Sequence, residues 1–318
     1  MLPLTGIKVV EFANNIAGPY TGYILAMLGA EVLKIERPQG GDDARGWGPP
    51  FWRGTSATFQ ALNVNKRGVT VDLKSTEAIA WVKEYVAGCD VLVHNMRPGV
   101  MEEIGLGSAA MRAANPRLIY CNVSAFGPTG PMQRNPGYEP MVQAFAGLFS
   151  INGYPDRPGA RIGTSVLDLG SAVWAALGCA TALYRRERTG SGGVVDASLY
   201  ETALGLLTVH FARYQASGTL PERHPSGSLA VVIFEAFDTA DGQVIVAAAN
   251  DRLFAKYANE VGHPEWVGDS RFKTNADRHA NKQVLLPMVR EIMRQQPSAS
   301  WVQRLDKAGV PCAAINDI

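Results

Sequence analysis

Cysteine is scarce in this sequence. The 318 residues contain four, Cys89, Cys121, Cys179 and Cys312, and none of them forms a Cys-x-x-Cys motif. No histidine stands at a spacing that would complete a zinc site, and no pair suggests a redox disulfide. We therefore expect reduced thiols, no metal site and a cytoplasmic protein.

Net charge and long apolar runs are lacking as well. Thirty Lys and Arg residues balance 29 Asp and Glu residues, which leaves a formal charge of +1 and argues against a nucleic-acid-binding surface. The longest uncharged stretch, residues 12–30, is interrupted by Asn14, Asn15 and Gly18-Pro19. The first residues do not form a basic leader followed by an apolar core. These features predict a soluble protein without a membrane partner, in which any anion site is local.

Several common motifs are absent. The first apolar run is followed by residues 13–19, which contain no Gly-x-Gly-x-x-Gly motif, and the chain has no P-loop Gly-Lys-Ser/Thr. A Gly-x-Ser-x-Gly nucleophile elbow is also missing. These absences argue against a dehydrogenase, a P-loop phosphotransferase and a serine α/β-hydrolase. No metal spacing relates the histidines, which are predicted to be structural or surface residues: His94, His210, His224, His263 and His279.

Short apolar runs alternate with helical patterns in the first part of the chain. Strands are predicted at 7–12, 31–35, 90–93 and 118–123, and helices at 20–28 and 77–87. This alternation is typical of an α/β fold with a Rossmann-like, doubly wound parallel sheet. Sheets of this kind bind ligands beyond the carboxyl ends of their strands.

The second part of the chain has a different pattern. After a Gly- and Pro-rich passage at 126–140, apolar helices are predicted at 168–186 and 200–216. A β-hairpin is predicted for 231–237 and 243–247 around the Asp-Gly turn at 238–242, followed by helices at 251–260, 281–294 and 298–308. We therefore expect a large Rossmann-like domain at 1–216, a linker at 217–228 and a smaller α+β domain at 229–318.

Several strings in register resemble one family, the class III acyl-CoA transferases. They are AGP at 17–19, LGAEVLKIERP at 28–38, NKRG at 65–68, VDLK at 71–74, NMRPG at 95–99, SAFGPTGP at 124–131, GYE at 137–139, Asp168 and RTG at 188–190. That family includes formyl-CoA and carnitine CoA-transferases and the α-methylacyl-CoA racemases. The resemblance implies a CoA-binding large domain, no cofactor beyond coenzyme A as co-substrate, and an interlocked homodimer. Family members continue past the AGVP at 308–311, so it also implies that the 318 residues lack a returning segment.

Asp168 resembles the nucleophile of this family. A carboxylate that attacks a thioester forms a mixed anhydride, which divides the transfer into easier covalent steps. The alternative for an aspartate beside a helix start is an N-cap. Burial can raise a carboxyl pKa by roughly 3–5 units, more than a helix terminus offsets. We therefore expect partial solvent access to Asp168, or hydrogen bonds from N–H groups near Gly18 or from the phenol of Tyr138.

Other site residues follow from the resemblance alone. Glu139 is expected either to orient or exchange protons with the incoming acid, or to act only as a helix-start carboxylate. The acyl group is expected beside Ile16, Ala17 and Gly18. Because formyl-CoA transferase carries a glutamine where Ile16 stands, a larger or less polar acyl group than formyl or oxalyl is favoured.

Coenzyme A brings phosphates that require cations and backbone donors. Arg37, Lys74 and Arg97 resemble the family's cations, although a lone Lys or Arg is more often a solvated surface residue. The resemblance adds five further contacts to CoA: Val71, Asp72, Leu73, Asn95 and Met96.

The predicted activity is transfer of CoA from an acyl-CoA, with succinyl-CoA as the candidate donor, to a small carboxylic or dicarboxylic acid. The first alternative is a 2-methylacyl-CoA racemase, although the racemases carry Gly-His-Asp where this chain has GYE at 137–139. A phenol with an ordinary pKa near 10 is a poor base at neutral pH. The second alternative is an acyl-CoA-binding protein without catalytic activity.

Overall fold

The computed structural model describes residues 1–318, and the chain divides into two compact units. Unit 1 comprises residues 1–150 and 160–220, and unit 2 comprises 151–159 and 221–318. The sequence-based boundaries differ from this division mainly at 151–159, which they place in the first domain. That segment joins unit 2 because Asn152 forms a β-bridge with His224, and Arg223 donates hydrogen bonds to the carbonyls of Tyr154 and Pro155.

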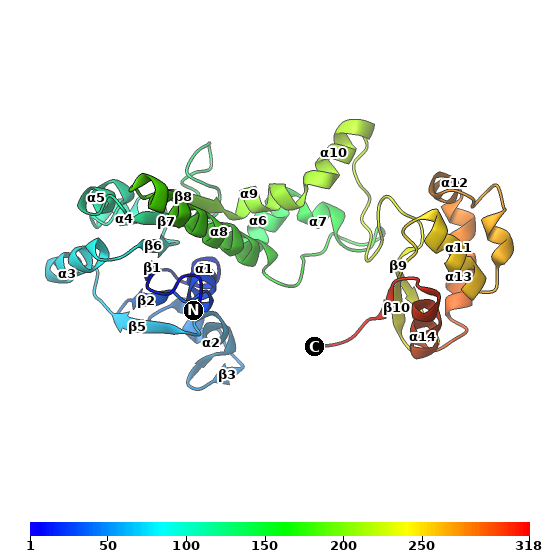
Figure 1. The fold of residues 1–318 in the computed structure, drawn as a ribbon, viewed down its shortest axis with the longest axis horizontal. Helices are drawn as coiled ribbons and strands as arrows, with labels where there is room; N and C mark the ends of the chain where they lie inside the picture. Colours follow the sequence, from blue (N-terminus) through cyan, green and yellow to red (C-terminus); the bar gives the residue numbers. More distant parts are fainter. The chain divides into compact units, whose positions relative to one another are not determined.

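Unit 1 is built on a sheet of six parallel strands (Figure 1). The order is β5-β2-β1-β6-β7-β8, with bounds β1 Lys8–Phe12, β2 Glu31–Glu36, β5 Lys66–Thr70, β6 Val91–His94, β7 Ile119–Ser124 and β8 Gly193–Ser198. The chain starts in the middle of the sheet, proceeds outward through β2 to β5, and then returns to β6 on the other side of β1. This order confirms the predicted doubly wound sheet and places its topological switch point between β1 and β6.

Helices cover both faces of this sheet. Adjacent β1 residues Val9 and Val10 are both fully buried, but they belong to different core clusters because side chains alternate along a strand. Val9 shares its cluster with helices α1 (Ala17–Met27) and α8 (Val166–Thr189), which lie side by side in Figure 1. Val10 shares its cluster with α3 (Thr76–Ala87) and α5 (Ser108–Ala114).

Helix α8 is long and apolar enough to cross a membrane by length and composition alone. It packs against α1, β7 and β8 through buried residues that include Ala175, Cys179 and Leu183. A core helix of a sheet protein passes the same test, so length and composition do not single α8 out as a membrane span.

The remaining elements of unit 1 are short. The segment predicted as one helix at 200–216 forms two, α9 and α10, which meet at Leu207. The sequence patterns predict neither edge strand, β5 or β8, because an edge strand is half exposed and its polar residues hide the apolar alternation. The other bounds are a 3₁₀ helix Asp43–Gly46, β3 Phe51–Trp52, β4 Thr55–Ser56, α2 Ala57–Leu62, α4 Val100–Glu103, α6 Glu139–Ala146, α7 Leu148–Ile151, α9 Leu199–Leu206 and α10 Thr208–Ser217.

Unit 2 contains an antiparallel sheet with the order β11-β10-β9 and a core of its own that includes Phe237, Phe254 and Trp301. The predicted hairpin is present, but its first strand begins at Phe234 rather than at residue 231, since Ile233 has a left-handed φ of 64° that interrupts the extended backbone. The bounds are β9 Phe234–Asp238, β10 Gln243–Ala247, α11 Asp251–Glu260, a 3₁₀ helix Pro264–Val267, α12 Asn275–Ala280, α13 Lys282–Met293, α14 Ser298–Ala308 and β11 Cys312–Ala314.

Candidate active site

A cavity of about 330 Å³ lies at the carboxyl ends of the central strands of unit 1. We call it the pocket. Its walls come from the loop after β1, the loop after β6, the end of β7, the Gly- and Pro-rich passage before α6, and the first turn of α8. The topology explains this position, because the loops after β1 and β6 diverge from neighbouring strands at the switch point.

The pocket brings together residues that are far apart in the sequence. Eight of the predicted site residues line it: Ile16, Ala17, Asn95, Met96, Arg97, Tyr138, Glu139 and Asp168. The convergence joins both predicted acidic residues with the predicted CoA contacts that follow β6. These roles stay predictions, but the fold places the residues where one ligand can meet them.

Six predicted residues do not line the pocket: Gly18, Arg37, Val71, Asp72, Leu73 and Lys74. Arg37 is exposed and pairs with Asp43, Lys74 is exposed, and Val71 is buried in the core. Their predicted contacts with CoA therefore require a ligand that extends beyond the pocket. Gly18 is buried, and a Cβ there would lie 2.5 Å from the Cβ of Ala13, so its local role is close packing.

Asp168 is the third residue of α8, so it is not the N-cap. Ser165 holds the N-cap position, and its side chain makes no capping hydrogen bond. The Asp168 carboxyl is half-buried and receives no hydrogen bond from Gly18 or Tyr138, whose side chain is 67% exposed. Burial raises its pKa to about 7, and the negative charge of Glu139 acts in the same direction, while Arg161 opposes them. Of the two expected ways to keep Asp168 ionised, the structure provides partial solvent access.

Glu139 is the first residue of α6, and its side chain is almost fully buried. Its carboxylate accepts hydrogen bonds from Arg161 at 2.9 Å, from the backbone N–H of Leu167 at 3.3 Å, and from the Gln143 amide. Leu167 belongs to the first turn of α8, so Glu139 supplies the cap that Ser165 does not. The carboxylate therefore ties α6 to the start of α8 and keeps a negative charge beside Asp168.

Arg161 is a site residue that the sequence analysis missed. It lies 22 residues after Glu139, in an irregular stretch before α8, and no motif or periodicity marks it. Only the fold brings its guanidinium to the Glu139 carboxylate. A lone arginine in a loop gives no signal that distinguishes it from a solvated surface residue.

The wall formed by the loop after β1 offers both a donor and an acceptor. Asn15 lines the pocket, and its Oδ1 is buried without a hydrogen-bond partner. The next residue, Ile16, is the N-cap of α1 and has no capping side chain, so N–H groups of the first turn remain available. An uncapped helix N-terminus favours negative charge on a ligand.

Other features of the chain give no comparable site. No group of three or more His, Cys, Asp and Glu residues lies together in a way that could hold a metal ion. A second cavity, of about 370 Å³, lies in unit 2 beside His224, Glu235 and Arg290. None of the predicted site residues lines it.

Comparison with known proteins finds relatives that match almost the whole chain. The family model described as CoA-transferase family III matches residues 4–318. The acetyl-CoA:oxalate CoA-transferase of Acetobacter aceti is 37% identical over 317 residues, which cover 99% of this chain and 81% of the relative. The succinyl-CoA–D-citramalate CoA-transferase of Chloroflexus aurantiacus is 38% identical, with 98% and 78% covered.

A solved structure shows the same fold. The crystal structure of a CaiB/BaiF family protein from Brucella suis superposes with a TM-score of 0.87 at 36% sequence identity, and the match covers 99% of this chain and 84% of that one. CoA-transferases use coenzyme A as a co-substrate. With the family match along nearly its whole length and relatives at this identity, the chain belongs to CoA-transferase family III.

Proposed function

We propose that this enzyme transfers CoA from succinyl-CoA to a small carboxylic or dicarboxylic acid through a covalent intermediate on Asp168. The observation that carries the proposal is the environment of Asp168, a half-buried carboxyl with a pKa raised to about 7 in the pocket at the switch point. A strongly perturbed group in a cleft is typical of a reacting residue.

The proposed reaction exchanges CoA between two acids. The Asp168 carboxylate attacks the thioester carbonyl, a C–O bond forms, and the C–S bond breaks with departure of the CoA thiolate. The thiolate then attacks the aspartyl carbonyl of this mixed anhydride, which releases the first acid and leaves an aspartyl-CoA thioester. The second acid attacks that thioester to form a new anhydride and frees the thiolate again. Attack of the thiolate on the acyl carbonyl of the new anhydride gives the new acyl-CoA and regenerates Asp168.

Two features of the pocket support these steps. A carboxylate with a pKa near 7 is more basic than an ordinary aspartate and is still about half ionised at neutral pH. The uncapped first turn of α1, after Ile16, offers N–H groups to the negative charge that develops on the attacked carbonyl oxygen. Glu139, held by Arg161, is proposed to orient the incoming acid.

The substrate class follows from the relatives and from the lining. The two relatives described above are named for oxalate and D-citramalate, and the succinyl-CoA:glutarate CoA-transferase of Mus musculus is 34% identical over 318 residues. Ile16 gives the pocket an apolar wall, which favours an acid larger or less polar than oxalate. Arg97 is exposed at the rim and is proposed to bind a phosphate of CoA, with Arg37 and Lys74 beyond the pocket.

A homodimer is part of the proposal. Helix α10 has no buried residue, although it carries Val209, Phe211 and Tyr214. On α8, Trp174 is 60% and Leu177 is 50% exposed. Exposed apolar surfaces of this kind are typical of subunit contacts. We also propose a cytoplasmic location, in keeping with the four free cysteines.

The test is a search for the covalent intermediate. The protein is incubated with succinyl-CoA without acceptor, treated with hydroxylamine and digested, and its peptides are analysed by mass spectrometry. We expect a modification on Asp168 that depends on the CoA ester. Asp196 is a matched control, since its pKa is also raised by burial but it lies on β8 outside the pocket. Modification of both aspartates, or of neither, would contradict the proposal.

A panel of acids then separates the alternatives. Turnover of succinyl-CoA with oxalate, glutarate or citramalate supports the transferase and excludes a binding protein without activity. Exchange of deuterium from D2O into the α-carbon of a 2-methylacyl-CoA would instead indicate a racemase. We expect no such exchange, because the residue at the position of the racemase base is Tyr138.

A further inference from the structure

The loop between β1 and α1 is held by three side chains from other segments. The Lys34 ammonium donates a hydrogen bond to the Ala13 carbonyl at 2.6 Å. The Asn95 amide accepts from the N–H of Asn14 at 2.9 Å and donates to its carbonyl at 2.7 Å. Asp42 accepts from the N–H of Asn15 at 2.9 Å. Consecutive backbone polar groups of the loop therefore have partners from β2, the segment after it and the loop after β6.

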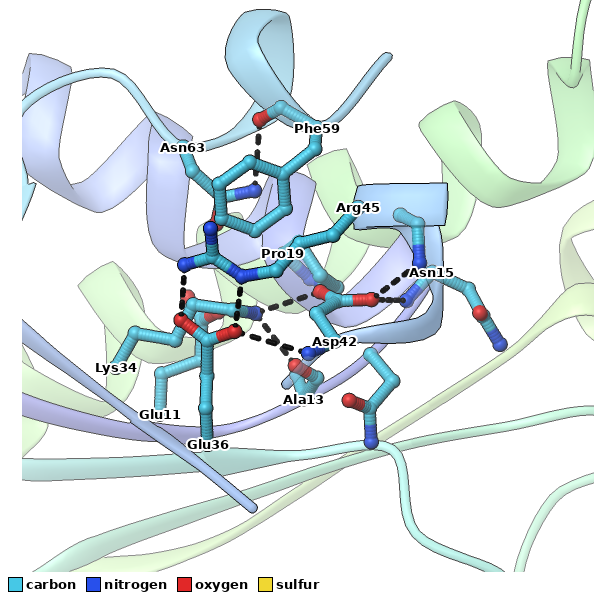
Figure 2. Close-up of polar contacts among 12 residues, drawn as sticks. Glu11, Ala13, Asn15, Pro19, Lys34, Glu36, Asp42, Arg45, Phe59 and Asn63 are labelled. Carbon is cyan, nitrogen blue, oxygen red and sulfur yellow. Dashed lines mark hydrogen bonds and ion pairs between the residues drawn. The ribbon is translucent and has the colours of Figure 1, made fainter. Parts of the chain in front are cut away.

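A buried ion network contacts this loop through Lys34 and Asp42 (Figure 2). Lys34 lies 2.9 Å from both Glu11 and Asp42, and these three side chains are at most 2% exposed. The second oxygen of Glu11 pairs with Lys66 at 2.9 Å. Two lysines and two carboxylates thus balance one another. Because each buried charge depends on the others, the network has little freedom to shift.

The loop combines an uncommon backbone conformation with close packing against α1. Asn15 has a left-handed φ of 69°, which asparagine tolerates better than most residues. A Cβ on Gly18 would lie 3.1 Å from Cγ of Asn95 and 2.5 Å from Cβ of Ala13. The start of α1 is therefore in direct contact with both the loop and Asn95. A displacement of the loop would therefore move the first turn of α1.

We propose that Lys34, Asp42 and Asn95 form a clamp that positions the loop at 13–15, and with it the pocket wall at Ile16 and Ala17, for reaction at Asp168. This inference rests on the proposed function, and it makes the three residues positioning residues rather than catalytic ones. It also gives Asn95 a role other than contact with CoA, since both polar atoms of its amide are engaged by Asn14.

The clamp matters because the first turn of α1 must meet a charge that exists only during reaction. Donors that are already in place stabilise such a charge without reorganisation. A displacement of about 1 Å at a reacting centre can cost about 10²-fold in rate. The buried network keeps the loop in place in the free enzyme, before any substrate binds.

The test compares three variants of the full chain. Lys34→Met removes the bond to Ala13 and leaves Asp42 unpaired. The double variant Lys34→Met/Asp42→Ala removes one charge of each sign, so the network stays neutral while the hydrogen bonds to the Ala13 carbonyl and to the Asn15 N–H are lost. The bonds between Asn95 and Asn14 remain in this variant. Arg186→Met is the matched control, because Arg186 is a buried cation of unit 1 that pairs with Asp90 at 2.8 Å and does not line the pocket.

The readouts are kcat and KM for succinyl-CoA, thermal stability, and hydrogen exchange of the Asn15 backbone N–H without substrate. We expect the double variant to regain stability relative to Lys34→Met, but to show fast exchange at the Asn15 backbone N–H and a kcat about 10²-fold below wild type, with a smaller change in KM. The control is expected to lose stability with little change in kcat or in the exchange of the Asn15 backbone N–H.

Two results would overturn the clamp: slow exchange of the Asn15 backbone N–H in the double variant, or a kcat for that variant equal to that of Arg186→Met. Neither result contradicts the proposed function if wild type turns over succinyl-CoA and Asp168→Asn does not. If wild type proves inactive with every acid, the proposed function fails, and the positioning role at Asp168 fails with it. The exchange data then show separately whether the clamp holds the loop.

Discussion

Two groups of buried carboxylates lie near the same loop of unit 1, and their surroundings differ sharply. In the buried ion network that holds the loop at 13–15, the carboxylates of Glu11 and Asp42 lie 2.9 Å from lysine ammonium groups. Burial lowers the pKa of Lys34, but the charges of Glu11 and Asp42 outweigh it, and the net result is a raised pKa. In the pocket, Asp168 has no hydrogen-bond donor, and its pKa rises to about 7.

The difference separates two uses of a buried charge. A buried carboxylate with a cation beside it can hold a backbone segment in place. A carboxylate that is desolvated without a partner is more basic and changes its charge near neutral pH, which suits a nucleophile. Glu139 is paired with Arg161, and its negative charge raises the pKa of Asp168.

The largest expected effect is loss of turnover on replacement of the unpaired group. Asp168→Asn keeps the shape of the side chain but has no anionic oxygen, and we expect kcat to fall by about 10⁶-fold. The measurement is steady-state transfer from succinyl-CoA, with Asp196→Asn as control. Activity within a hundredfold of wild type would show that Asp168 is not the nucleophile.

In the paired network, the expected effect is on stability. Lys34→Met leaves Asp42 buried without its cation, and we expect the free energy of unfolding to fall by about 3–5 kcal/mol. Urea denaturation followed by circular dichroism measures it. A loss smaller than about 1 kcal/mol would mean that the network is not tightly coupled, and the contrast with the pocket would disappear.

The stability of Asp168→Asn should depend on pH. The folded-state pKa of Asp168, about 7, lies above the ordinary aspartate value of 3.8, so the folded protein holds its proton more tightly than the unfolded chain does. Ionisation of Asp168 therefore costs stability as pH rises from about 4 to 7. We expect the variant to melt at a higher temperature than wild type at about pH 8, and this advantage to vanish near pH 4.

The smallest expected effects are opposite shifts of the pH–rate profile. Wild-type activity should rise with pH through about 7, as Asp168 ionises. Glu139→Gln removes a negative charge and should move this limb toward lower pH, whereas Arg161→Met removes a positive charge and should move it toward higher pH. We expect shifts of about one unit, measured as kcat/KM between about pH 5 and 9. Shifts in the same direction would contradict the assigned electrostatics.

The sequence predicts the parts of the fold that repeat a strong pattern. Strands such as β6, with four buried residues in a row, have apolar runs that only a covered sheet explains. The resemblance leads to Asp168 and Glu139 because both sit in recognisable strings. It does not lead to Arg161, and it does not show that Lys34, Asp42 and Asn95 hold one loop, although Lys34 and Asn95 lie in matching strings. These contacts depend on the order of the strands in the sheet, which cannot be derived from a local sequence pattern. In the sequence, the charged residues that make these contacts resemble ordinary surface residues.

The division of the chain into two units also determines which fragments of the protein can be expected to fold separately. Residues 151–159 belong to unit 2, whereas 160–220 return to unit 1, so the backbone passes between the units at three places. A single proteolytic cut at any one of them leaves two covalent connections intact. A fragment that begins at Pro221 would lack the carbonyls of Tyr154 and Pro155 to which Arg223 is bound. Residues 160–220 of unit 1 therefore interrupt unit 2, and joining 151–159 to Pro221 through a short linker is the rational way to express unit 2 separately.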